Sequence, residues 1–224
     1  MKQRAVFLDR DDTLIVNVPY LGDPTRVEIF PEAAEALYAL RKAHFLIFVV
    51  SNQSGVGRGL ITRGEVSAVD AEMKRQLNGD YIHAFYHSFA APDDPYATDR
   101  KPSPELVLQA AKIHDLDLAA SFFIGDRLSD IECGINAGCR TVLLTHAKSS
   151  RKENPEEDDA VARGKAHYLA TTLTEAVQWI LDVTSTTPAP KTHELERNPS
   201  SSSPRATVRP VFPARALPAS RAVP

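Results

Sequence analysis

The sequence predicts an α/β fold, a Rossmann-like doubly wound parallel sheet in three αβα layers without a cap domain. Short apolar runs alternate along the chain with segments of helical apolar spacing, as in repeated βα units. The runs are apolar throughout, as expected for strands covered on both faces. Polar clusters follow several of these runs directly, and ligands of such sheets bind beyond the carboxyl ends of the strands.

The first half of the chain is predicted to form a strand, a helix, a strand, a helix and a strand, at residues 5–9, 31–44, 45–52, 62–79 and 81–88. Leu37 and Leu40 belong to the helical apolar spacing of the first helix. Thr62 and Glu65 form the capping-box pattern that opens the second.

The second half is predicted to form a helix, a strand, a helix, two strands and a helix, at residues 103–114, 121–126, 129–137, 141–146, 167–170 and from 172 onward. Ser103 and Pro104 fit the N-cap and first position of a helix. Thr172 and Glu175 indicate the cap of the last helix, whose Trp179 is expected in the core.

Two regions of different composition divide the chain. Residues 1–183 have the length of one ordinary domain. Residues 184–224 contain eight of the sixteen prolines, a run of serines, and six Lys/Arg against two Asp/Glu. Such a segment buries too little apolar surface to offset its ordering entropy, so we predict a disordered Pro/Ser/Arg-rich tail. A tethering role is the alternative.

Composition also limits location and partners. The formal net charge is −3, and the basic tail makes residues 1–183 more negative still, which argues against nucleic acid. The sequence shows no span of membrane length and no signal segment, so we expect a cytoplasmic protein, and a monomer. Cys133 and Cys139 are interpreted as packing thiols in a reducing compartment.

Acidic residues crowd the end of the first predicted strand. Asp9 and Asp11 flank Arg10 and are followed by Asp12. Residues two apart in an extended segment point to one side, so both carboxylates can face one site. Carboxylates without zinc ligands suit a hard cation, Mg²⁺ first. A solvated acidic turn is the alternative.

Other strand ends add matching groups. Asp126 directly follows an apolar strand, with Asp130 four residues on, although Asp126 could instead cap the next helix. Ser51 and Asn52 begin a glycine-rich loop that also contains Arg58, and such loops let backbone N–H groups approach phosphate. Arg100 and Lys101 precede a predicted helix start, where cations can face an anion. By themselves they would be interpreted as a basic pair on the protein surface.

Together these pieces resemble the four motifs of the haloacid dehalogenase superfamily of phosphatases, across residues 5–183. The finer match is to the D-glycero-D-manno-heptose 1,7-bisphosphate phosphatase and histidinol-phosphate phosphatase family. It rests on the segments LDRD, SNQSGVGRG, RKPSP and GDRLSD.

The resemblance implies a role for each matching residue. Asp9 would be the nucleophile that forms an aspartyl-phosphate, and Asp11 the general acid and then base. Mg²⁺ would be held by Asp9, the backbone carbonyl of Asp11, and Asp126, with Asp130 supporting the metal site. The transferring phosphoryl group would be bound by Ser51 and Lys101, and the substrate by Asn52, Arg58, Arg100 and Arg127.

The chain departs from this family at two places. Asp12 stands where glycine is usual, and the sequence assigns it no role. Many members bind a structural zinc through cysteines and a histidine before the RKP segment, but residues 87–99 contain no cysteine, so no structural zinc is expected. His87, near the edge of the site, is interpreted as structural.

The resemblance and the intervals between motifs define the expected function. The intervals 14–50 and 52–100 leave no room for a cap domain, so an open site is expected, covered by loops 17–30 and 92–99. We expect a Mg²⁺-dependent phosphatase that removes a phosphate from a sugar bisphosphate, a small phosphorylated metabolite. Histidinol-phosphate phosphatase, a non-catalytic phosphate-binding or interaction protein, and a phosphoacceptor regulatory domain are the alternatives.

Overall fold

The computed structural model describes residues 2–145 and 161–185. The last helix, α7 (Leu173–Ser185), extends two residues beyond the predicted domain end at 183. The rest of the predicted tail lies outside the described residues. No helix in the described part of the chain is long and apolar enough to cross a membrane.

Six parallel strands form one sheet, in the order β3-β2-β1-β4-β5-β6. Their bounds are Ala5–Leu8 (β1), Leu46–Asn52 (β2), Ala84–Ser88 (β3), Phe122–Gly125 (β4), Arg140–Leu144 (β5) and Tyr168–Ala170 (β6). After β1 the chain adds β2 and β3 on one side of the sheet, and after β4 it adds β5 and β6 on the other side. The switch point therefore lies between β1 and β4, and the predicted doubly wound sheet is confirmed.

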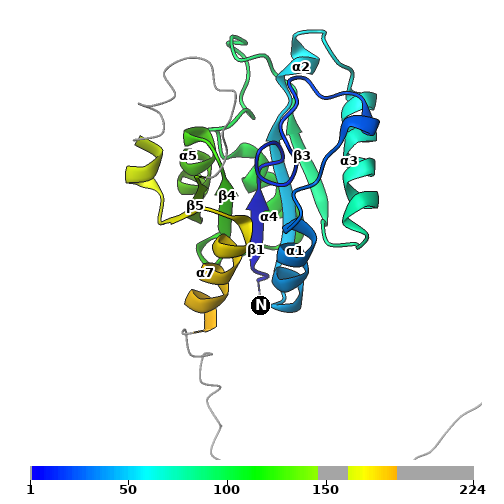
Figure 1. Ribbon diagram of the computed structural model, residues 1–224. Coiled ribbons are helices and arrows are strands. Elements are labelled where there is room, and N and C mark those ends of the chain that lie inside the picture. Colours follow the sequence, from blue (N-terminus) through cyan, green and yellow to red (C-terminus); the bar gives the residue numbers. More distant parts are fainter. Residues whose placement is uncertain (1, 146–160, 186–224) are drawn as a thin grey trace, which may run out of the picture. The chain divides into compact units, whose positions relative to one another are not determined.

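Helices cover both faces of the sheet (Figure 1). One face is packed by α1 (Ala33–Lys42), α3 (Arg63–Leu77) and α7, and α1 and α7 lie side by side on it. The other face is packed by α4 (Glu105–His114) and α5 (Leu128–Ala137). These three layers are the predicted αβα architecture.

The strands are apolar throughout because both of their faces are buried. In β1, Leu8 belongs to the core under α1, α3 and α7, whereas Phe7 faces α4 and α5. The Phe7 ring stacks on Phe48 and Phe123, with centroids 5.5 and 6.3 Å away. Full burial of a side chain of this size contributes about 1.5–3 kcal/mol.

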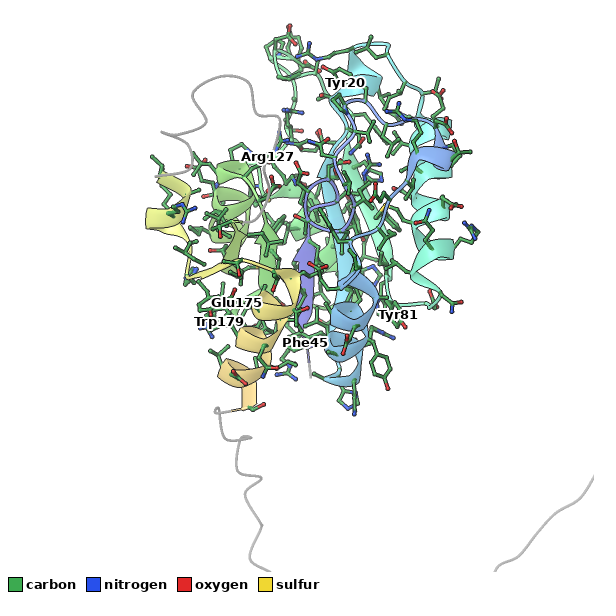
Figure 2. All side chains as sticks on the ribbon, viewed as in Figure 1. Tyr20, Phe45, Tyr81, Arg127, Glu175 and Trp179 are labelled. Atoms are coloured by element: carbon green, nitrogen blue, oxygen red, sulfur yellow. The ribbon has the colours of Figure 1, made fainter. Side chains whose placement is uncertain are left out.

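Trp179 and the two cysteines pack largely as expected. Trp179 is half-buried at the edge of the core and stacks on Tyr168 at 4.8 Å, at the end of the sheet opposite Arg127 (Figure 2). Cys133 and Cys139 are buried free thiols, and burial raises the pKa of each to about 12. Both therefore stay protonated near neutral pH, as packing thiols do.

The structure differs from the predicted elements in local detail. The glycine-rich segment contains one helical turn, α2 (Ser54–Gly57), and two 3-10 turns were not predicted, η1 (Pro24–Arg26) and η2 (Leu118–Ala120). Helix α4 begins at Glu105, one residue late, although Ser103 Oγ still accepts a hydrogen bond from Glu105 N. The Thr62–Glu65 capping box of α3 is confirmed.

Candidate active site

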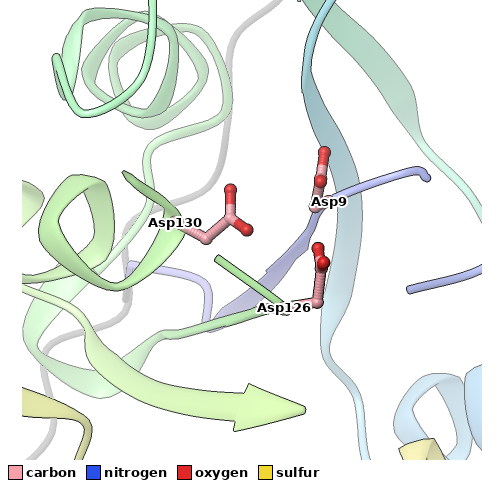
Figure 3. A group of neighbouring side chains, drawn as sticks. All are labelled: Asp9, Asp126 and Asp130. Carbon is pink, nitrogen blue, oxygen red and sulfur yellow. The ribbon is translucent and has the colours of Figure 1, made fainter. Parts of the chain in front are cut away.

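Three carboxylates meet at the switch point of the sheet (Figure 3). Asp9 follows β1 directly, Asp126 follows β4, and Asp130 comes from the first turn of α5. An oxygen of each lies within 4.8 Å of an oxygen of the others, and all three residues are buried. Asp126 is not the cap of α5, since Arg127 occupies that position.

Lys101 compensates part of this buried negative charge. Its Nζ lies 2.8 Å from Asp9 Oδ1, 2.6 Å from Asp130 Oδ1 and 2.8 Å from the carbonyl oxygen of Val50. Burial by itself would lower the pKa of Lys101, but the carboxylates of Asp130 and Asp9 outweigh it and raise that pKa. Lys101 is therefore a buried cation held against the predicted nucleophile.

Asn52 places the Lys101 backbone at the end of β2. Its Oδ1 accepts a hydrogen bond from Lys101 N at 3.0 Å, and its Nδ2 donates to Lys101 O at 3.2 Å. Asn52 was predicted to contact substrate, and its contacts in the structure are with the segment that presents the lysine.

Each oxygen of the Asp130 carboxyl group contacts a different neighbouring residue. Oδ2 accepts a hydrogen bond from Arg127 N at 3.0 Å, and Oδ1 pairs with Lys101. Burial raises the pKa of Asp130, and the Lys101 ammonium opposes that rise. The carboxyl group packs directly over Gly125, where a Cβ atom would overlap the Asp130 side chain.

We predict that Gly125→Ala displaces Asp130 from Lys101. The overlap should lower stability by roughly 1–3 kcal/mol, the usual cost of overpacking, and lower phosphatase activity with it. Thermal unfolding and initial rates test this. The matched control is Gly64→Ala in α3, where a Cβ has its nearest contact at 3.8 Å. A Gly125→Ala protein with wild-type melting temperature and rate would contradict the packing argument.

The Asp11 carboxylate is not part of the three-carboxylate cluster and is held by Arg10 and Gln53. Its two oxygens contact Arg10, and Oδ2 also accepts a hydrogen bond from Gln53 Nε2 at 3.0 Å. Gln53 Nε2 also donates to the hydroxyl of the buried Ser51 at 2.8 Å. The predicted metal contact of Asp11 was its backbone carbonyl, which leaves its side chain available for proton transfer.

Asp12 has a conformational role that the sequence did not reveal. Its φ is +59°, a left-handed conformation in which glycine, Asn and Asp are favoured. Its carboxylate accepts hydrogen bonds from Asn17 N at 3.3 Å and Asn17 Nδ2 at 3.1 Å. Aspartate therefore replaces the glycine of the family pattern and closes the turn that follows the nucleophile.

Three arginines gather beside the carboxylate cluster. Burial lowers the pKa of Arg100, and the positive charges of Arg127 and Arg58 lower it further, so Arg100 lies close enough to each of these two arginines to be repelled by it. Arg127 Nε lies 3.8 Å from Asp126 Oδ2, and half of its side chain is exposed. Cations that repel in this way favour the binding of an anion between them.

The loop before Lys101 is closed by hydrogen bonds. Ser88 Oγ donates to Asp99 Oδ1 at 2.7 Å, across the stretch 87–99 that contains no cysteine. Between this loop and α2 lies a pocket of about 430 Å³, lined by Val56, Gly57, Arg63, Phe89, Ala90, Asp94, Tyr96, Ala97, Thr98 and Asp99. That no structural zinc is needed stays a prediction.

Sequence reasoning missed several side chains around Asp11. Gln53 and Arg10 hold the Asp11 carboxylate, and Asp70 of α3 joins Arg10 to His87 of β3. The one signal for Arg10 was its place between two aspartates at the end of a buried strand. His87 Nε2 lies 2.6 Å from Asp70 Oδ2, and the structural role of His87 stays a prediction.

The buried carboxylates fit a hard divalent cation. The cluster supplies only carboxylate oxygens, the ligands preferred by Mg²⁺, and contains no thiolate or imidazole. Lys101 offsets one of its three negative charges.

Comparisons with known proteins agree with this geometry. Residues 98–176 match the model of the HAD-hydrolase-like family. The chain is 34% identical over 155 residues to a D-glycero-D-manno-heptose-1,7-bisphosphate 7-phosphatase of Chlorobaculum tepidum, covering 63% of this chain and 78% of that protein. It is 31% identical to the enzyme of the same name from Thermosynechococcus vestitus, over 80% of this chain and 96% of that protein.

A solved structure extends the similarity to the fold. The D,D-heptose 1,7-bisphosphate phosphatase of B. bronchiseptica, complexed with magnesium and phosphate, superposes with a TM-score of 0.69 at 25% identity. The match covers 80% of this chain and 99% of that one. The similarity thus covers most of this chain and nearly all of that one.

Proposed function

The chain belongs to the haloacid dehalogenase-like phosphatases, and we propose that it is a Mg²⁺-dependent enzyme that hydrolyses the 7-phosphate of D-glycero-D-manno-heptose 1,7-bisphosphate. The observation that carries this proposal is the buried Asp9 carboxylate, held by Lys101 at 2.8 Å within a cluster of three carboxylates. Mg²⁺ bound there by Asp9, the Asp11 carbonyl and Asp126 would neutralise charge on the phosphate and on the carboxylates.

The protein's own groups supply the remaining steps. An Asp9 oxygen attacks phosphorus, the bond from phosphorus to the sugar oxygen breaks, and Asp11 gives its proton to that oxygen. Asp11 then takes a proton from a water molecule, which attacks the phosphorus of the aspartyl-phosphate and frees Asp9 and inorganic phosphate. Ser51 and Lys101 hold the phosphoryl oxygens in both steps.

The arginine cluster supports a substrate with a second phosphate. Arg100 is repelled by Arg58 and by Arg127, Arg127 lies beside Asp126, and a phosphate dianion bound between these cations would relieve the repulsion. The absence of a cap domain among the described residues leaves the site accessible to such a sugar bisphosphate.

Assembly and location complete the proposal. We propose a monomer that acts in the cytoplasm on a small phosphorylated metabolite and binds no nucleic acid. The formal net charge of −3 supports the absence of a nucleic-acid partner.

A substrate panel tests the proposed function. Phosphate release is measured with Mg²⁺ from heptose 1,7-bisphosphate, the corresponding monophosphates, other sugar bisphosphates and histidinol phosphate. We expect the highest kcat/KM for heptose 1,7-bisphosphate, with loss of the 7-phosphate. Preference for histidinol phosphate would assign the chain to that activity, and no release from any ester would favour a phosphate-binding protein.

Replacing Asp11 tests its double role in proton transfer. We predict that Asp11→Asn slows both formation and hydrolysis of the phosphoenzyme, each by roughly 10²–10⁴-fold, because a positioned acid or base contributes about that much. Rapid-quench kinetics with heptose 1,7-bisphosphate separates the two steps. Unchanged rates for both would remove Asp11 from the mechanism.

A further inference from the structure

A buried arginine lies next to the catalytic carboxylates and takes no part in the steps above. Arg10 is the largest fully buried side chain among the described residues, with 1% of its surface exposed. A guanidinium group without water is costly unless anions and acceptors surround it. Its partners therefore show what it does in this fold.

Arg10 and Gln53 hold both oxygens of the Asp11 carboxylate. Arg10 Nε and Nη2 lie 3.2 Å from Asp11 Oδ2 and Oδ1, respectively. Arg10 Nη2 also donates to Gln53 Oε1 at 3.0 Å, and Gln53 Nε2 donates to Asp11 Oδ2. The orientation of the Asp11 carboxylate thus depends on where the guanidinium group lies.

The remaining guanidinium nitrogen faces an anion on a different element. Arg10 Nη1 lies 3.6 Å from Oδ1 of Asp70, which α3 presents toward the sheet. Neither atom has a hydrogen-bond partner in the described part of the chain, so charge attraction is what joins them. Asp70 Oδ2 lies 2.6 Å from His87 Nε2 on β3. Buried contacts therefore link Asp11, through Arg10 and Asp70, to the edge strand.

We propose that Asp70 and His87 are positioning residues for the phosphatase reaction. His87 holds Asp70, Asp70 holds one side of the Arg10 guanidinium group, and Arg10 orients the Asp11 carboxylate toward the leaving oxygen. The inference rests on the proposed function, since Asp11 transfers its proton only in that reaction. A displacement of about 1 Å in a reacting group can lower the rate by about 10²-fold.

The test uses the leaving group, because an alkoxide needs a proton from Asp11 and a nitrophenolate does not. We compare kcat/KM for heptose 1,7-bisphosphate and p-nitrophenyl phosphate in the wild type and in Asp70→Ala. We expect about a tenfold or larger loss for the sugar phosphate, with KM nearly unchanged, and less than about threefold for the nitrophenyl ester. Equal losses for both esters, or no loss, would overturn the proposal.

Two further variants serve as a size-preserving replacement of Asp70 and as a control on the same helix. Asp70→Asn preserves the size of the side chain and an acceptor for His87 but removes the charge that faces Arg10, so it should show the same selectivity. If Asp70→Ala does not fold, Asp70→Asn decides by the same criterion. Glu72→Ala, two residues along α3, breaks an exposed ion pair with Arg75 and should change neither ester's rate. A selective loss in Glu72→Ala would contradict a specific role of Asp70.

His87 is tested by its own pair of variants. His87→Ala should reproduce the selective loss of Asp70→Ala, and His87→Gln, which retains a donor for Asp70, should restore part of the rate. Failure of the proposed function has a different signature, namely no phosphate release from either ester by the wild type. With an active wild type, an unselective result overturns only the roles of Asp70 and His87.

Discussion

Asp9→Asn is expected to abolish turnover of every phosphate ester. An amide at this position cannot form the acyl phosphate, so kcat should fall by on the order of 10⁴-fold or more, as for other lost nucleophiles. The loss should not depend on the substrate, because every ester would pass through the same aspartyl-phosphate. Initial rates with heptose 1,7-bisphosphate and Mg²⁺ provide the measurement.

Asp12→Asn is the matched control for Asp9→Asn. It also removes one carboxylate charge next to the site, but Asn tolerates the left-handed conformation that Asp12 adopts. Its activity should stay within a few-fold of the wild type. Near-normal turnover in Asp9→Asn would reject Asp9 as the nucleophile.

Lys101→Met is expected to affect stability as strongly as activity. Without the ammonium group, Asp9 and Asp130 would be left as buried carboxylates that lack their cation. Breaking a buried ion pair from one side costs about 3–5 kcal/mol, which for a domain of this size lowers Tm by roughly 6–20 °C. Scanning calorimetry without added metal, together with phosphatase rates, measures both effects.

Lys165→Met is the control for Lys101→Met, because it removes a lysine from an ion pair that is exposed instead of buried. Lys165 lies 2.6 Å from Glu132, but its side chain is 46% exposed, and such surface pairs contribute little. Its Tm and rate should be close to those of the wild type. If Lys101→Met were no less stable than Lys165→Met, the buried carboxylates would not depend on Lys101 for their compensation.

The sequence predicted the site residues directly after strands more reliably than it predicted the side chains that contact them. Asp9 and Asp126 were found because apolar runs locate the strands, and the ends of parallel strands meet at one edge of the sheet, whereas Lys101 was found through the family resemblance. The four motifs then fixed their order. The structure adds distances and shows that Asp130 lies in the same cluster as Asp9 and Asp126.

The sequence did not predict residues whose contacts form between elements that are far apart along the chain. Asp70 meets both Arg10 and His87 only because α3 packs beside the strands that carry them, and no local pattern in the sequence records that packing. The role of Asp12 depends on its positive φ, which no periodicity reports. The start of β3 at residue 84 was placed at 81, since the apolar pattern begins before the ladder does.

The most direct test of the account is to trap the phosphoenzyme. Protein is mixed for a single turnover with heptose 1,7-bisphosphate carrying ³²P at position 7, quenched in acid and digested. We predict transient label on the peptide that contains Asp9, labile to hydroxylamine as acyl phosphates are, and none in Asp9→Asn. Release of labelled phosphate without any labelled peptide, or label on another residue, would contradict the account.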